Sequence, residues 1–193
     1  MNFGILMLPH PSTAAAGLVD ILLMCSRSYP TELGHIPDGV TQTGLSMEIY
    51  YITTDTEPPP EPIGIYQSLQ ITPYYECPPL NYLLISGSSS AADLSDDCAR
   101  FLESQVTGAE AVFTTYTGTL LLAQTRLLDD THVAIPCTLL RQVQQRYPSV
   151  LWTASQRWIV DGRIRSAASS YAAMDMIVHW VIEKFNSTVT RST

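Results

Sequence analysis

Blocks of apolar and polar residues follow one another along this chain, and they predict strands and helices in alternation. Apolar runs of three to seven residues, rich in β-branched and aromatic side chains, are typical of buried strands. They lie at Phe3–Leu8, Met47–Thr53, Tyr82–Ile85, Ala111–Thr114, Val133–Ile135, Val150–Thr153, Arg157–Val160 and Arg163–Ser166. Helical spacing or composition predicts helices over Ala14–Arg27, Asp93–Ser104, Thr138–Arg146 and Ser170–Phe185, with a further one from Leu120. Strands that alternate with helices indicate βαβ units and a mostly parallel sheet covered on both faces.

The connections between these elements support the same organisation. The segments Tyr29–Gly44 and Glu57–Pro62 are rich in proline, and the second of them excludes a helix or a central strand. Asp161-Gly162 predicts a tight hairpin between the last two strands. The chain has 193 residues without an internal repeat or a linker, so we expect one domain over residues 1–193.

The segment Val112–Arg126 is the most informative part of the chain. Its strand ends at Thr115-Tyr116-Thr117-Gly118, and a leucine-rich helical pattern begins immediately afterwards. A strand, a sharp turn and a helix in this order are the layout of a nucleophile elbow, in which the turn residue is normally Ser or Cys. Here that residue is Tyr116, so the segment has the architecture of a nucleophilic enzyme without the nucleophile.

Composition excludes several classes of function. The formal net charge is -8 and no run of Lys or Arg is present, so we expect no nucleic-acid partner. No apolar run approaches the length of a membrane span, and the first residues lack the basic segment of a signal peptide. We therefore expect a cytoplasmic protein with no membrane contact. The four cysteines are widely spaced, which argues against a zinc site, and we expect no metal and no cofactor.

Four motifs together resemble the ThiJ/PfpI superfamily, and within it the fungal, isonitrile-hydratase-like branch. They are Val112–Leu128, Gln156–Gly162, Ser166–Met176 and Tyr82–Ser88, and the similarity runs over almost the whole chain. The resemblance implies a flavodoxin-like three-layer α/β/α sandwich. It also implies a homodimer.

The departures from the family pattern gather at its active site. The family's Cys falls on Tyr116, its acidic partner falls on or beside Ala14, and a polar residue after a later strand falls near Pro136. The family's Pro-Gly-Gly becomes Ser86-Gly87-Ser88. Covalent thiol chemistry with a carboxylate partner is therefore not expected.

Tyr116 is the main candidate for chemistry. A phenol near neutral pH donates a hydrogen bond or a proton, so Tyr116 either acts as a general acid or simply fills the space left by the thiol. His10 follows the first strand and is the second catalytic candidate, with an exposed loop histidine as the alternative. The expected substrate-binding residues lie around the turn: Ser86, Gly87, Ser88, Thr115, Thr117, Gly118 and Tyr171. Their alternatives are an ordinary polar turn and helix capping by threonine.

The remaining candidates each have a structural interpretation beside the functional one. Cys137 suggests a relocated nucleophile, but a small buried core cysteine is the expected reading. Asp20 suggests an acid on the first helix, and a surface carboxylate is the alternative. His179 and Trp180 are expected to pack.

Two functions remain open. The first is a cofactor-independent enzyme that acts on a small electrophilic or enolisable molecule by noncovalent acid–base chemistry, as an isomerase, a cyclase or a hydro-lyase. The resemblance to fungal sequences places such an enzyme in specialised metabolism. The second is a pseudoenzyme that binds a metabolite or a protein partner without catalysis.

Overall fold

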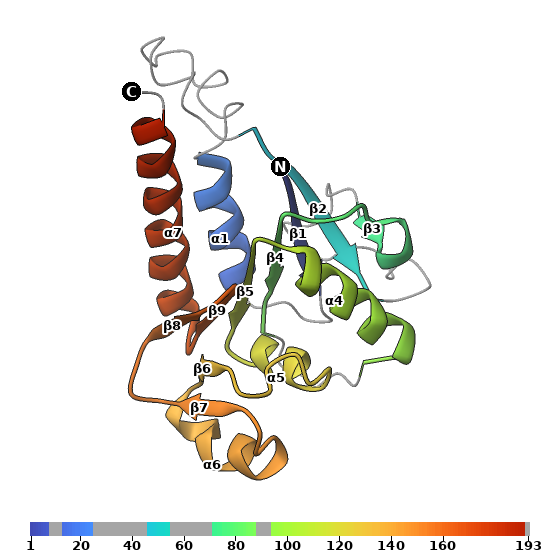
Figure 1. Ribbon diagram of the computed structural model, residues 1–193, viewed down its shortest axis with the longest axis vertical. Coiled ribbons are helices and arrows are strands. Elements are labelled where there is room, and N and C mark those ends of the chain that lie inside the picture. Colours follow the sequence, from blue (N-terminus) through green and yellow to red (C-terminus); the bar gives the residue numbers. More distant parts are fainter. Residues whose placement is uncertain (8–12, 25–45, 55–70, 88–93, 192–193) are drawn as a thin grey trace.

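A seven-stranded sheet forms the centre of the molecule (Figure 1). The computed structural model describes residues 1–7, 13–24, 46–54, 71–87 and 94–191. The strand order is β3-β2-β1-β4-β5-β9-β8, and every neighbouring pair is parallel except β8 and β9. The strands are β1 (Asn2–Met7), β2 (Glu48–Thr53), β3 (Ile71–Pro73), β4 (Tyr82–Ile85), β5 (Ala111–Thr115), β8 (Trp158–Asp161) and β9 (Ile164–Ala167). The predicted, mostly parallel sheet is confirmed.

Helices cover both faces of this sheet. These helices are α1 (Thr13–Met24), α4 (Asp96–Gly108), α5 (Gly118–Ala123) and α7 (Ser170–Arg191), whereas α6 (Cys137–Arg146) packs beside the segment Leu151–Thr153. One apolar core lies between the sheet and the pair α1 and α7, and the other lies under α4 and α5. Figure 1 shows α1 and α7 side by side on one face. The protein is therefore a flavodoxin-like α/β/α sandwich, as the sequence predicted.

Strand β4 shows why the strands appear in the sequence as unbroken apolar runs. Leu83 and Ile85 belong to the core under α4 and α5, whereas Tyr82 and Leu84 belong to the core under α1 and α7. All four side chains are buried. A parallel strand buried on both faces has no polar positions to alternate with its apolar ones.

An aromatic cluster holds α7 against the sheet. The Trp180 ring from α7 lies 4.8 Å from the Tyr82 ring and 5.2 Å from the Phe113 ring, in edge-to-face arrangements. Phe3 completes the cluster from β1, with its ring centroid 6.2 Å from that of Trp180. Edge-to-face aromatic pairs add to the free energy gained by burial. Trp180 is thus a packing residue, as expected.

The sheet differs from the sequence prediction at two places. Strands β6 (His132–Ala134) and β7 (Leu151–Thr153) do not join the main sheet but form a separate two-stranded parallel sheet. The Ala134 N–H, instead of entering a ladder with the main sheet, donates to Ser166 Oγ at 2.9 Å. Strand β3 and the 3₁₀ turn Tyr74–Glu76 were not predicted, because a three-residue strand that ends in proline carries too little pattern.

Element boundaries shift where capping groups decide them. Helix α4 begins at Asp96 rather than Asp93, because Ser95 Oγ accepts a hydrogen bond from Cys98 N at 3.3 Å and caps the helix. It continues to Gly108, beyond the predicted Ser104. The hairpin turn at Asp161-Gly162 is confirmed, with Gly162 at φ 57. The predicted helix end at residues 25–27 lies outside the described residues.

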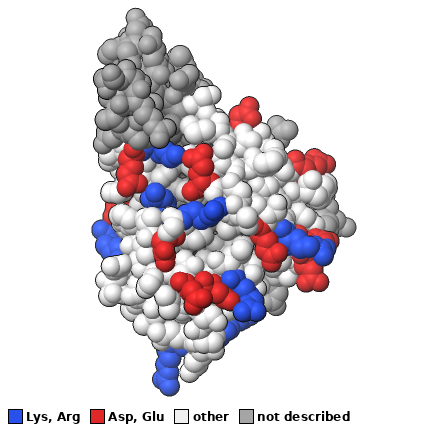
Figure 2. All heavy atoms as spheres, in the orientation of Figure 1, with Lys and Arg blue, Asp and Glu red and all other residues white. Residues whose placement is uncertain are grey.

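Two expectations from the sequence concern contact with nucleic acids and with membranes. On the face shown in Figure 2, acidic and basic side chains are interspersed and no basic stripe is visible. Within the described part of the chain, no helix combines the length and the apolar character that a bilayer crossing requires.

Glu110 connects the sheet with α7, and its ionisation should contribute to stability. Lys184 Nζ donates to Glu110 Oε2 at 2.9 Å and Tyr82 OH donates to the same oxygen at 2.7 Å. These hydrogen bonds, with that of Lys184 the larger cause, lower the pKa of Glu110. A lowered pKa in the folded state adds stability above the unfolded value of about 4.3, and this is lost as the pH falls through the folded value.

We predict that Glu110→Gln lowers the melting temperature at pH 7 and that this decrease is smaller at pH 3, because protonation of Glu110 removes its charge as the pH falls through the folded pKa. The cost at pH 7 should be below about 1 kcal/mol, because the carboxylate is half exposed and salt screens it. Thermal unfolding of both proteins at the two pH values measures this. Glu103→Gln, on the exposed surface of α4, is the control. An equal decrease in melting temperature at both pH values would show that packing, and not charge, explains the effect of Glu110→Gln.

Candidate functional site

The turn between β5 and α5 has the predicted strand–turn–helix geometry. Strand β5 ends at the buried Thr115, Tyr116 reverses the chain with φ 51, and α5 begins at Gly118. The Tyr116 side chain is 39 % exposed. The prediction that Tyr116 lies at the tip of a strand-to-helix turn is therefore confirmed.

The backbone around Tyr116 is fixed by hydrogen bonds to its neighbours. Its N–H donates to the carbonyl of Ala167 at the end of β9 at 2.9 Å, and its carbonyl accepts from Thr119 N at 3.4 Å. A left-handed conformation costs a residue with a bulky side chain about 1–3 kcal/mol and persists only where the surroundings enforce it. Arg126 and Asp130 share the positive φ, in the turns after α5. The sheet thus holds Tyr116 in place despite the local strain.

Two glycines let the end of β4 approach this turn. A Cβ at Gly118 would lie 2.3 Å from the Ile85 carbonyl oxygen and 2.9 Å from the Ser86 carbonyl group. A Cβ at Gly87 would lie 3.1 Å from Thr117 N. Backbone atoms at these distances leave no room for a side chain, so the sequence must have glycine at position 118. The polar ends of β4 and β5 are brought together as a result.

The N–H groups at this edge are partly used by the fold itself. Gly87 N–H, which was expected to face a ligand, donates to Thr115 Oγ1 at 3.2 Å. Tyr116 N–H is bound to Ala167. Gly118 supplies an amide of the first helical turn, where N–H groups have no intrahelical acceptor. Helix α5 has only six residues, which limits its dipole.

Buried polar side chains lie beneath the turn. Thr114 Oγ1 and Thr119 Oγ1 form a buried hydrogen bond of 2.9 Å, which the sequence did not indicate. Ser86 is fully buried, and within the described structure its Oγ has no hydrogen-bond partner. A buried hydroxyl without a partner costs free energy, and functional sites are one setting where such a cost is retained. Ser86 is therefore under the turn, not on its surface.

The other predicted site residues have different outcomes. Ser88 and His10 lie outside the described residues. Thr117 occupies the N-cap position of α5, but its side chain makes no capping hydrogen bond, and its Oγ1 lies close to Gly87. Tyr171 is 79 % exposed in the first turn of α7. Asp20 is exposed on α1, which fits its surface alternative.

The prediction that Cys137 is buried was wrong. Cys137 is exposed, because it is the first residue of α6 and directly follows Pro136. Cys98 is buried, and burial raises the pKa of the half-buried Cys77 to about 11. Cys25 lies outside the described residues. None of the described cysteines belongs to the β5–α5 turn.

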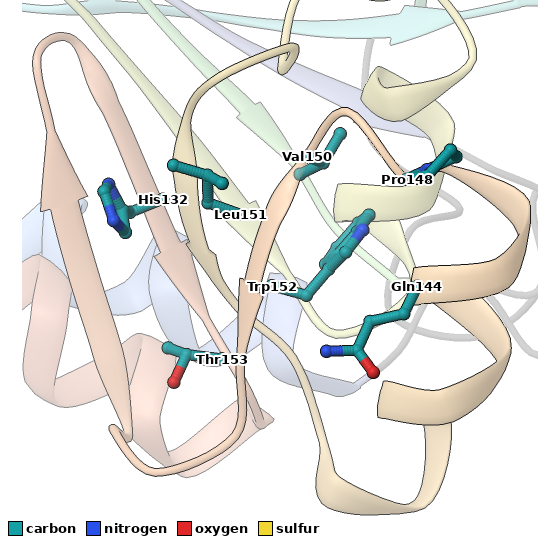
Figure 3. A pocket seen from close by; sticks show the side chains of 7 residues that line it. All are labelled: His132, Gln144, Pro148, Val150, Leu151, Trp152 and Thr153. Carbon is teal, nitrogen blue, oxygen red and sulfur yellow. The ribbon is translucent and has the colours of Figure 1, made fainter.

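A second polar location lies away from Tyr116, beside the β6–β7 sheet. Figure 3 shows one of the two hollows there, with His132 and Thr153 on one side of β7 and Trp152 and Gln144 on the other. His132 was not singled out in the sequence. Its partner Asp161 lies 29 residues away, so no local pattern could have indicated the pair. Among the described residues, no group of three or more His, Cys, Asp or Glu side chains is arranged to hold a metal ion.

Comparisons with known proteins reveal the fold. No protein-family model matches the sequence, and no curated protein matches it. Solved structures do match. An AraC family transcriptional regulator from Pseudomonas putida has 17% sequence identity and a TM-score of 0.68, with 97% of this chain and 98% of that chain covered.

Two further matching structures are named as DJ-1 superfamily and ThiJ/PfpI family proteins. A DJ-1 superfamily protein from Agrobacterium tumefaciens has 16% identity and a TM-score of 0.60, with 100% of both chains covered. A ThiJ/PfpI family protein from Pseudomonas syringae has 16% identity and a TM-score of 0.62, with 94% of this chain and 68% of that chain covered. The chain has the ThiJ/PfpI and DJ-1 superfamily fold. At these identities the likeness concerns the fold, and the activities that the names suggest belong to those proteins.

In this fold the Tyr116 turn lies at the carboxyl edge of the parallel strands. The sheet order reverses between β1 and β4, and open α/β sheets bind ligands beyond the carboxyl ends of the strands at such a reversal. Ser86 follows β4, directly beside this reversal, and Tyr116 follows β5, one strand further along the same edge.

The close approach at Gly118 can be tested directly. We predict that Gly118→Ala lowers the melting temperature by several degrees, because the methyl group meets the backbone of β4 and overpacking costs about 1–3 kcal/mol. Gly108→Ala is the matched control, because a Cβ there meets no atom within 4 Å. Thermal unfolding of both variants is the measurement. If Gly118→Ala were as stable as Gly108→Ala, the turn would not depend on this approach.

Proposed function

We propose that the Tyr116 turn is the substrate site of a cofactor-independent enzyme that acts on a small electrophilic or enolisable molecule. The observation that carries the proposal is the backbone of Tyr116. It keeps the strained conformation of a nucleophile elbow, with φ 51, and presents an exposed phenol at the carboxyl edge of the sheet. Strain that the surrounding structure maintains is typical of functional positions.

The chemistry of the turn suits stabilisation of a developing negative charge. The phenol of Tyr116 donates a hydrogen bond, and the first-turn amide at Gly118 lies two residues further on. Two donors near one position favour an enolate or another oxyanion. Because α5 is short and Gly87 N–H is bound to Thr115, Tyr116 must supply most of the stabilisation. Isomerisation, cyclisation and addition or elimination of water are the reactions that fit.

A second function, a pseudoenzyme that binds a metabolite or a protein partner, has its own supporting observation. The N–H groups of Gly87 and Tyr116 both donate within the fold, at 3.2 Å and 2.9 Å. An oxyanion site built from backbone amides needs such groups unoccupied. In this alternative, Tyr116 contacts a bound molecule without proton transfer. The homodimer, the cytoplasmic location and the absence of a nucleic-acid partner stay predictions from the sequence.

The two functions can be separated without knowledge of the natural substrate. Small enolisable ketones (pyruvate, dihydroxyacetone and 2,4-pentanedione) are incubated with the protein in D₂O, and ¹H NMR follows exchange of the proton next to the carbonyl. The proposed enzyme accelerates exchange of at least one ketone above the buffer rate. A protein that accelerates none of them contradicts the enzyme proposal and leaves the binding function.

We predict that Tyr116→Phe lowers this exchange rate by about 100-fold, because one positioned donor contributes on that scale. The melting temperature should change little, because the ring remains in place. Tyr116→Ala should lower both the rate and the stability, since it also removes the packing of the ring. Tyr75→Phe, at another exposed tyrosine, is the matched control. A fully active Tyr116→Phe variant would exclude the phenol as the donor or the acid.

We also predict that any activity resists thiol alkylation. Cys98 is buried and the pKa of Cys77 is raised to about 11 by burial, so iodoacetamide should modify the exposed Cys137 before either of them. Cys137 begins α6 and does not belong to the Tyr116 turn. Mass spectrometry and the exchange assay together follow modification and rate. Loss of activity in step with Cys137 modification, together with an inactive but folded Cys137→Ser variant, would restore the relocated nucleophile.

A further inference from the structure

Two adjoining hollows lie beside the β6–β7 sheet, one toward the β8–β9 hairpin and the other toward α6. One hollow of about 410 Å³ is lined by residues that include His132, Thr153, Ser155, Val160 and Asp161. A second hollow, of about 510 Å³, shares His132 and Thr153 with the first. We call the two together the hairpin groove. It is independent of the Tyr116 turn, since no residue of that turn lines either hollow among the described residues.

Asp161 fixes the orientation of His132 at the centre of the groove. Its Oδ2 accepts the His132 N–H at 2.8 Å and lies 3.3 Å from Nδ1 of the same residue. The backbone hydrogen bond is the largest cause that lowers the pKa of Asp161, so the carboxylate stays ionised. In the imidazole tautomer that donates from Nδ1 to this carboxylate, Nε2 is a hydrogen-bond acceptor.

The rest of the lining is complementary to a cation with an apolar group. Thr153 Oγ1 and Ser155 Oγ lie 3.0 Å apart and add two hydroxyl acceptors. Val160 and Leu151 are each 42 % exposed and provide apolar surface in the two hollows. Among the described residues that line the groove, none is Lys or Arg. The groove therefore combines an anionic group, several acceptors and two apolar side chains.

We propose that the hairpin groove binds a small organic ammonium ion that carries a short apolar chain. An ammonium group has three donors and a positive charge, which match the carboxylate of Asp161, Nε2 of His132 and the hydroxyl pair. The apolar chain contacts Leu151 and Val160. Asp161 is partly exposed, so the electrostatic attraction is modest and the dissociation constant should be about 1 mM.

Titration with hexylammonium tests this proposal, with ¹H–¹⁵N correlation spectra as the readout. We expect shift changes that saturate and that concentrate at the backbone amides of residues 132, 151–156 and 159–161. Hexanoate, with the opposite charge, should cause none of these changes, and 1-hexanol should bind at least tenfold more weakly. Added salt should weaken the binding of hexylammonium, because it screens the charge of Asp161.

Matched variants separate a specific site from general attraction to an acidic protein. Asp161→Asn keeps an oxygen that can accept from His132 N–H, and it should weaken binding about tenfold. His132→Gln should weaken it as well. Asp175→Asn removes another partly exposed carboxylate, on α7, and should leave binding unchanged. Shifts scattered over the surface, equal weakening by Asp161→Asn and Asp175→Asn, or equal binding of hexanoate would overturn the proposal.

Discussion

The close approach between the end of β4 and the start of α5 is the constraint on which the candidate site depends. The Ile85 carbonyl oxygen would lie 2.3 Å from any Cβ at Gly118, so the two backbones touch without a side chain between them. The chain can enter α5 at this distance only if it reverses sharply after β5. Tyr116 makes that reversal with a positive φ, and its side chain is consequently directed out of the sheet. The geometry of a nucleophile elbow therefore persists although its residue is a tyrosine.

The same approach determines which polar groups remain available for chemistry. Thr115 Oγ1 accepts the hydrogen bond of Gly87 N–H, and the carbonyl of Ala167 on β9 accepts that of Tyr116 N–H. The hydroxyl of Ser86 is enclosed without a partner. Backbone amides thus contribute less than the strand–turn–helix layout alone would suggest. Within the described part of this edge, the phenol of Tyr116 is an exposed donor, and our proposal rests on it.

The two-stranded β6–β7 sheet creates a second polar environment by a different route. Ser166 accepts the N–H of Ala134, and Asp161 accepts the N–H of His132, so two side chains from β8 and β9 hold β6 beside the main sheet. Side-chain oxygens accept these two backbone N–H groups, whereas in a β-ladder backbone carbonyls would accept them. The ionised carboxylate and the imidazole then remain at the surface of the hairpin groove. The described structure therefore has a second polar surface that is separate from the Tyr116 turn.

The sequence by itself determined the strands that are buried on both faces and the turns that need special backbone conformations. Tyr82–Ile85 was predicted residue for residue, because burial on both faces leaves an unbroken apolar run. The turns at Tyr116 and Gly162 were also evident, since each follows from a few neighbouring residues. Such features depend on local conformation and on a period that can be counted along the chain.

Only the tertiary structure decided what those elements contact. Three hydrogen bonds show this: Gly87 N–H to Thr115, His132 to Asp161, and Ala134 N–H to Ser166, which holds β6 outside the main sheet. Each of them joins residues that are 28 to 32 positions apart. The exposure of Cys137 likewise follows from its place at the start of α6, not from its residue type. Hydrophobic periodicity indicates which residues are buried, but hydrogen bonds between distant segments have no period. They form only after the sheet has brought their donors and acceptors together.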